Sequence, residues 1–129
     1  MRFSVPVVPI LAAVLAAGAL PSAALARPAL VKAVPAADAA VTRPTTLTLT
    51  FSEELAPVSG IDLVMTAMPG MADHKPMPIK GFTAKTSGKV LTVALPRPLP
   101  VGTYRLSWHA VGNTADQDRA EGSYSFKVR

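Results

Sequence analysis

The sequence predicts an all-β domain, a β-sandwich or small Greek-key barrel of about seven short strands, and three observations support this prediction. Hydrophobic residues alternate with polar ones along several segments, and a period of two is typical of half-buried strands. Clusters of turn-forming residues, chiefly proline and glycine, separate these segments at short intervals. Signals for helices are scarce beyond the N-terminal segment, and the remaining length suits one small domain.

Individual strands follow from the alternation. In the clearest case Leu47, Leu49 and Phe51 share one face of a strand whose other face carries threonines. A second strand places Trp108 in phase with apolar neighbours, so that we expect it in the core. The full set of predicted strands covers residues 29–34, 46–51, 60–64, 79–84, 91–95, 104–109 and 124–128. We find no internal repeat and no second domain.

Residues 1–26 have the features of a Sec signal peptide rather than of a folded segment. Arg2 supplies a positive start, residues 5–20 are apolar and uncharged, and Ala24-Leu25-Ala26 fits the small-residue cleavage pattern. Prolines at positions 6 and 9 argue against a retained membrane helix. We therefore expect a periplasmic domain of residues 27–129 with no membrane span after cleavage.

Composition excludes several function classes. The predicted mature chain carries 12 basic and 8 acidic residues, a net charge of +4, and its cations are scattered singly. Nucleic-acid binding is therefore not expected, because no basic run or interleaved aromatic patch is present. The chain has no cysteine, which excludes disulfides, a thiol nucleophile, a zinc knuckle and an iron–sulfur cluster.

The chemistry of the chain concentrates in the thirteen residues from Met65 to Met77, M-T-A-M-P-G-M-A-D-H-K-P-M. This window holds every methionine except the initiator, together with one of the two histidines. Thioether sulfur is a soft, neutral donor that selects Cu(I) over Zn, Mg or Ca, and imidazole also suits copper. The donors are spaced three residues apart: Met65, Met68, Met71, His74 and Met77. The pattern predicts a copper site.

Two plainer interpretations compete with this prediction. Methionine fills gaps in cores and also forms apolar patches that bind partner proteins. A spacing of three could also mark one face of a helix, but Pro69, Gly70 and Pro76 interrupt any helix here. We therefore expect a loop whose methionine side chains lie mostly outside the core.

The chain resembles the periplasmic copper-resistance protein family CopC along residues 28–129. The resemblance rests on L-V-K-A-V-P-A-A-D-A-A-V (30–41), L-T-L-T-F-S-E-E-L (47–55), S-G-I-D-L-V-M-T-A-M-P-G-M (59–71), G-T-Y-R-L-S-W-H-A-V (102–111) and G-S-Y-S-F-K-V (122–128). It implies a seven-stranded, cupredoxin-like (immunoglobulin-like) Greek-key β-barrel. It also implies a Cu(I) site formed by Met65, Met68, Met71, His74 and Met77 and leaves open which three or four bind at once.

The family's second site, for Cu(II), uses an N-terminal histidine with its free amine and a D-x-H stretch before the last strand. Here Arg27 stands at the expected mature N-terminus, and Asp116 and Asp118 take the places of the stretch's Asp and His. Because both imidazoles are missing, the resemblance implies weak Cu(II) binding at most. His109 and Asp116, with the terminal amine, are the residues that would support any remaining affinity.

These observations predict a periplasmic binding protein that sequesters or shuttles Cu(I) in copper homeostasis and resistance, and not an enzyme. Family analogy suggests as partner an inner-membrane copper transporter of the CopD type or a periplasmic copper oxidase. The alternative is a non-metal interaction module, or a methionine-oxidation sensor, that uses the same loop. A copper-dependent oxidative enzyme would need an N-terminal histidine, and Arg27 argues against it.

Overall fold

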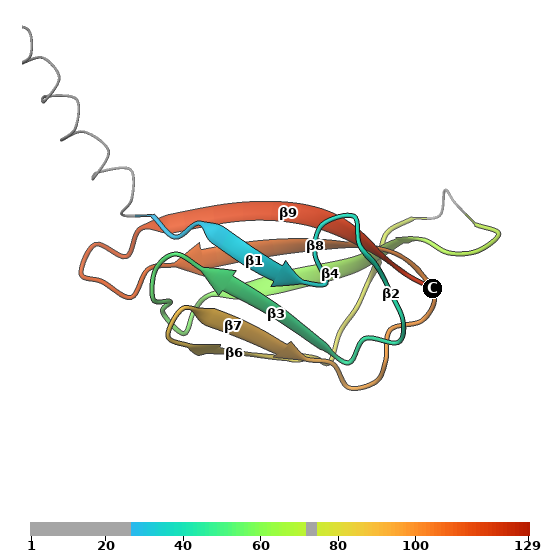
Figure 1. Cartoon of the computed structure of the whole chain (residues 1–129), viewed down its shortest axis with the longest axis horizontal. Coiled ribbons are helices and arrows are strands. Elements are labelled where there is room, and N and C mark those ends of the chain that lie inside the picture. Colours follow the sequence, from blue (N-terminus) through green and yellow to red (C-terminus); the bar gives the residue numbers. More distant parts are fainter. Residues whose placement is uncertain (1–26, 72–74) are drawn as a thin grey trace, which may run out of the picture.

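The computed structural model describes residues 27–71 and 75–129 and consists of two β-sheets that form a sandwich (Figure 1). The four-stranded sheet has the spatial order β1 (Leu30–Val34), β3 (Thr46–Phe51), β7 (Val90–Ala94) and β6 (Thr83–Ser87). The five-stranded sheet has the order β2 (Ala40–Val41), β9 (Arg119–Val128), β8 (Gly102–Val111), β4 (Gly60–Ala67) and β5 (Met77–Pro78). Seven of these strands have five or more residues, and the predicted all-β sandwich is confirmed.

Strand positions agree with the alternation in the sequence at six of the seven predicted places. The seventh, a strand over 79–84, is wrong for its first four residues, because β6 begins at Thr83 and residues 79–82 connect it to β5. Gly81 adopts a positive φ of 85° in this connection, a conformation that a strand does not accommodate. Within the described ranges we find no helix, and hence none that is long and apolar enough to cross a membrane.

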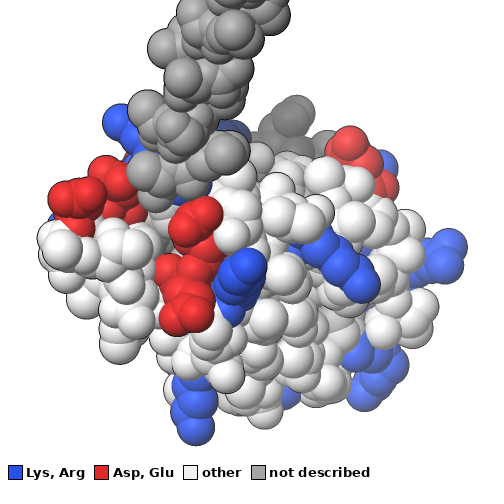
Figure 2. Space-filling view, turned by 60° about the vertical axis from the view of Figure 1, so that its left-hand side comes forward, with Lys and Arg blue, Asp and Glu red and all other residues white. Residues whose placement is uncertain are grey.

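The connections between strands meet at two ends of the sandwich. At one end the last residues of β4, the start of β8 and the end of β9 are neighbours, since Ala67 pairs with Thr103 and Gly102 pairs with Val128. At the other end the segment after β3 lies against the β8–β9 connection, where the Asn113 amide donates to the Glu54 carbonyl at 2.9 Å. Figure 2, in which the left-hand side of Figure 1 comes forward, shows acidic side chains on this second end. We call these two the methionine end and the acidic end.

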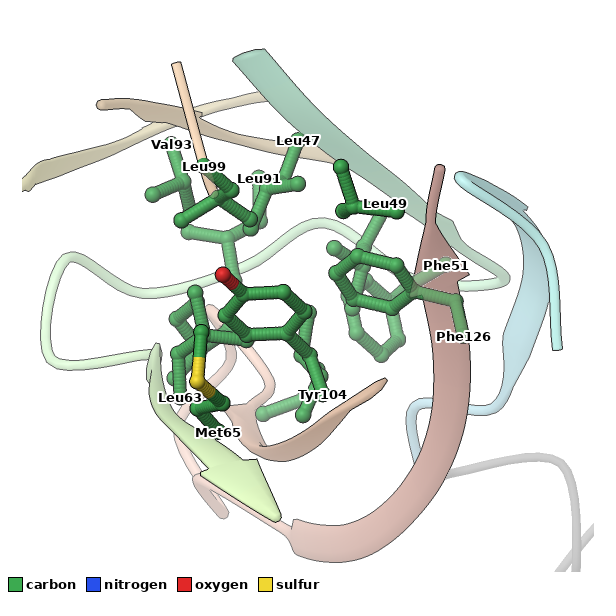
Figure 3. Packing of buried hydrophobic residues seen from close by; sticks show 14 of the residues in the cluster. Leu47, Leu49, Phe51, Leu63, Met65, Leu91, Val93, Leu99, Tyr104 and Phe126 are labelled. Carbon is green, nitrogen blue, oxygen red and sulfur yellow. The ribbon is translucent and has the colours of Figure 1, made fainter. Parts of the chain in front are cut away.

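The core between the sheets is built from the inward faces of the alternating strands (Figure 3). The side chain of Tyr104 is fully buried and stacks on Phe126 with ring centroids 5.7 Å apart. Its hydroxyl donates a 2.6 Å hydrogen bond to the Pro100 carbonyl, which satisfies the one polar group that the ring brings into the core. Other side chains that are at most 2% exposed are Leu47, Leu49, Phe51, Leu63, Leu91, Val93, Leu106 and Ala110.

Trp108 packs against this core but is only partly buried. Its indole meets Phe51 edge to face with centroids 5.1 Å apart. The same ring lies over Gly122, its cross-strand partner in β9. A Cβ atom at residue 122 would come within 2.5 Å of the indole, so this position requires glycine for the close approach of the ring.

Candidate metal centre

Met65 lies in the core, and the expectation that the window's methionines lie mostly outside the core is wrong for this residue. Its side chain is 4% exposed, and Figure 3 shows its sulfur among core side chains that include Leu63 and Tyr104. The physical reason is the two-residue period of β4, in which Ile61, Leu63 and Met65 point inward in turn. The window is therefore a loop only after Ala67, the last residue of β4.

A tight turn follows β4 and brings two methionines together. The Met71 amide donates to the Met68 carbonyl at 2.9 Å, and the Met68 amide donates to the Met71 carbonyl at 3.3 Å. Between them stand Pro69 and Gly70, and Gly70 has a φ of 81°, so this is a type II turn with the residues that this turn favours. Directly opposed residues in such a bridge point to the same side with Cβ atoms about 4.5–5.5 Å apart. Two flexible thioether arms at this separation can reach one ion.

The C-terminal end of the methionine window lies beside its N-terminal end. Met77 begins β5 and pairs with Met65 of β4, and the Ile79 amide donates to the Leu63 carbonyl at 2.8 Å. The segment between the two strands is thereby closed into a loop that starts and finishes at adjacent positions of one sheet. Met71 and Met77 are 54% and 46% exposed, and Met68 is partly buried against the core.

The two exposed methionines lie outside the core cluster. Burial of apolar surface contributes about 25 cal/mol per Å², and half of each of these side chains remains in water. A gap-filling role in the core, which describes Met65, therefore does not account for Met71 and Met77. His74 and its two preceding residues lie outside the described residues, so the structure gives no position for the predicted imidazole donor.

The residues that would support any remaining Cu(II) affinity lie toward the acidic end. His109 donates a 2.9 Å hydrogen bond from Nε2 to the Val58 carbonyl, and its ring rests against Gly60. Since a carbonyl oxygen can only accept, Nε2 carries the hydrogen and only Nδ1 retains a lone pair for a metal. Its cross-strand neighbour on β9 is Glu121.

Asp116 and Asp118 belong to the β8–β9 connection, which is closed by a hydrogen bond from the Gly112 amide to the Asp118 carbonyl. In residues 27–71 and 75–129 no three histidine, aspartate or glutamate side chains come together in a group that could hold a metal ion. The acidic end therefore differs from the methionine end both in its donor atoms and in how they are arranged.

Two structural features of the methionine end were not predicted. Pro69 and Gly70 were expected only to interrupt a helix, although proline followed by glycine is also the signature of a type II turn. The second feature is Gly102, where a Cβ atom would lie 2.7 Å from the Ala67 carbonyl oxygen and 3.2 Å from the Met65 Cε. This glycine lets β8 begin close against the end of β4.

The structure thus defines a small all-β domain that presents thioether side chains from a tight turn and a neighbouring edge strand at one end of a sandwich. Residues 30–129 match the family model of the CopC domain, so the chain belongs to the CopC family, and the resemblance predicted from its motifs is confirmed.

Relatives and solved structures agree with this assignment. The chain is 44% identical over 108 residues to copper resistance protein C of Escherichia coli, with 82% of this chain and 84% of the relative covered. It is also 44% identical over 119 residues to copper resistance protein C of Xanthomonas campestris pv. juglandis, with 90% and 91% covered. Among solved structures it is similar to PcoC, a methionine-rich copper resistance protein from Escherichia coli, with a TM-score of 0.69 and 39% identity over 81% of this chain and 100% of that chain.

Proposed function

We propose that this protein is a periplasmic copper-binding protein that holds Cu(I) at the methionine end and passes it on, in copper homeostasis and resistance. The observation that carries the proposal is the type II turn that sets Met68 beside Met71, with the exposed thioether of Met77 at the start of the neighbouring strand. The relatives named copper resistance protein C support copper as the ion and resistance as the setting.

The proposed ligands are drawn from Met68, Met71, Met77 and His74, with imidazole as the strongest single donor. Met65 is the predicted ligand least suited to this role, because its thioether is already packed in the core. Its contribution is to anchor the loop, since it is the last inward residue of β4 and pairs with Met77.

The donor set suits a carrier rather than an enzyme. Thioethers are neutral, so they favour Cu(I) over Cu(II) and need not lose a proton to bind. Individually weak donors on a surface loop can also be exchanged one at a time for those of an acceptor. A redox enzyme would instead need a site that accommodates both valences of copper.

The proposal also covers the export of the protein and the partner with which it exchanges copper. The Sec signal peptide proposed for residues 1–26 lies outside the described residues, and its cleavage would deliver the domain of residues 27–129 to the periplasm. The proposed recipient or donor of copper is an inner-membrane copper transporter of the CopD type or a periplasmic copper oxidase, by family analogy.

Competition for Cu(I) against a chromophoric chelator under reducing conditions tests the proposal. The purified exported protein should take up one Cu(I) and leave Zn(II) unbound. A variant with Met68, Met71 and Met77 replaced by leucine should lose this Cu(I), because leucine keeps the apolar volume and removes the sulfur. The matched control is Met65→Leu, which should bind as the wild type does.

Unchanged Cu(I) affinity in the triple variant would show that these methionines do not form the copper site and would refute the copper-carrier proposal. The alternative, a non-metal interaction module or methionine-oxidation sensor that uses the exposed Met71 and Met77, would then replace it.

A further inference from the structure

Two hollows adjoin each other at the methionine end, one on either side of residues 100–101. The first, of about 330 Å³, lies where β4, β8 and β9 meet, and its lining includes Met68, Pro69 and Val101. The second, of about 280 Å³, lies between the β5–β6 and β7–β8 connections, and its lining is rich in proline from Pro78 to Pro100. The methionine turn therefore forms part of the wall of an open, largely apolar depression.

Each hollow carries two exposed cations and no acidic residue from the described part of the chain. Lys127 and Arg129 line the first hollow, and Lys80 and Arg97 line the second. These four residues come from three separate segments, and folding brings them around the same end of the sandwich.

Most of the acidic residues collect at the opposite end, although Asp38 lines a neighbouring hollow together with Lys127. Five of the chain's eight acidic side chains belong to the segment after β3, the β8–β9 connection and the first residues of β9: Glu53, Glu54, Asp116, Asp118 and Glu121. Hydrogen bonding between the first two of these segments holds the group together, and acidic side chains on this side of the molecule are visible in Figure 2. A protein with this separation of charge approaches a charged partner in a preferred orientation.

We propose that the two hollows at the methionine end form the docking surface for an acidic protein segment that carries apolar side chains. Its carboxylates would pair with the four rim cations, and its apolar side chains would enter the hollows beside Met68. The inference rests on the proposed function, because copper transfer requires the acceptor's donor atoms to come within bonding distance of the loop. A protein segment fits better than a membrane surface, because the depressions are concave and a flat lipid surface would leave them unfilled.

The probe is a short fluorescein-labelled peptide in which methionine alternates with aspartate and glutamate, and its anisotropy is measured with the purified exported protein. Binding should weaken as ionic strength rises, because the rim charges are exposed and screened by salt. A counterpart peptide with lysine at each acidic position should not bind. The amide resonances of Val101 and Thr103 should shift on titration, and that of Gly112 at the acidic end should not.

Charge reversal at matched positions isolates the surface. The test variant carries Lys80→Glu, Arg97→Glu and Lys127→Glu, and the control variant carries the same number of reversals at other exposed cations, Lys32→Glu, Lys89→Glu and Arg119→Glu. The test variant should bind the acidic peptide about tenfold or more weakly, and the control should retain wild-type affinity. Both should bind Cu(I) as the wild type does, since neither set contains a proposed ligand.

Several results would overturn the inference. Equal weakening in both variants would show that net charge alone matters, and equal binding of the lysine peptide would exclude charge recognition. A further such result is that the wild-type protein binds vesicles of phosphatidylcholine and phosphatidylglycerol and not the acidic peptide. If the test variant lost that vesicle binding, the partner would be an anionic membrane surface. The Cu(I) competition is read separately, so a failure of docking is distinguishable from a failure of the copper proposal.

Discussion

Replacement of Met65 and of Met71 by alanine should separate stability from metal binding. Met65 is 4% exposed within the core, and truncation of a buried methionine to alanine costs about 2–5 kcal/mol through lost burial and a residual cavity. We expect about 3 kcal/mol for Met65→Ala, because the residue lies at the edge of the core where β4 leaves it. For a domain of this size that loss lowers Tm by roughly 10 °C or more.

Met71 should behave in the opposite way. Its side chain is 54% exposed and its backbone bonds do not depend on the side chain, so Met71→Ala should change stability by no more than about 0.5 kcal/mol. As a proposed ligand it should nevertheless matter for copper. Loss of a residue that merely supports a ligand costs about 10–100-fold in metal affinity, so loss of Met71 should cost at least about tenfold.

Urea unfolding followed by the fluorescence of Trp108, the chain's one tryptophan, measures the first effect, and Cu(I) competition measures the second. Met65→Leu is the control, because a swap of similar volume should cost less than about 1.5 kcal/mol. If Met65→Ala were no more destabilising than Met71→Ala, the placement of Met65 in the core would be refuted. If Met65→Leu lost Cu(I) as fully as Met71→Ala, Met65 would be a ligand after all.

Further predictions concern the fold and the acidic end. The metal-free protein should give a β-type far-UV circular dichroism spectrum, since apolar side chains of the two sheets build the core; a disordered spectrum that becomes ordered only with copper would contradict this. Gly122→Ala should destabilise the domain and alter tryptophan fluorescence, because the new Cβ would lie 2.5 Å from the ring of Trp108; unchanged fluorescence would count against the packing. Burial raises the pKa of Tyr104 and of Tyr124 to about 12, so the folded state keeps two protons that the unfolded state loses above pH 10. Stability should therefore be constant below about pH 9 and fall as the pH rises from about 10 to 12, as urea titrations would reveal. Cu(II) should bind weakly at most, since Arg27 and Asp118 stand where the family's Cu(II) site has its two histidines; a stoichiometric sub-micromolar Cu(II) complex in a titration would refute this.

Local sequence patterns were enough to predict individual strands, to exclude a helix and to identify the candidate copper site. The alternation of Leu47, Leu49 and Phe51 predicted a strand and its buried face, because the period of two depends on the backbone of that segment alone. Pro69 and Gly70 excluded a helix for the same kind of reason, since both act through their own dihedral angles. The soft donors also depended only on residue type, so the residue types of the methionine window were enough to identify it as a candidate copper site.

Pairing between strands that are distant in sequence decided which side chains are buried and which become neighbours. Met65 was predicted to lie outside the core, and it lies inside because the opposite sheet covers the inward face of β4. Likewise, Lys127 lines the same hollow as Met68, although about sixty residues separate them in the chain, because β8 pairs with both β4 and β9. No local pattern specifies such a neighbour, since strand order and register result from the packing of the whole core.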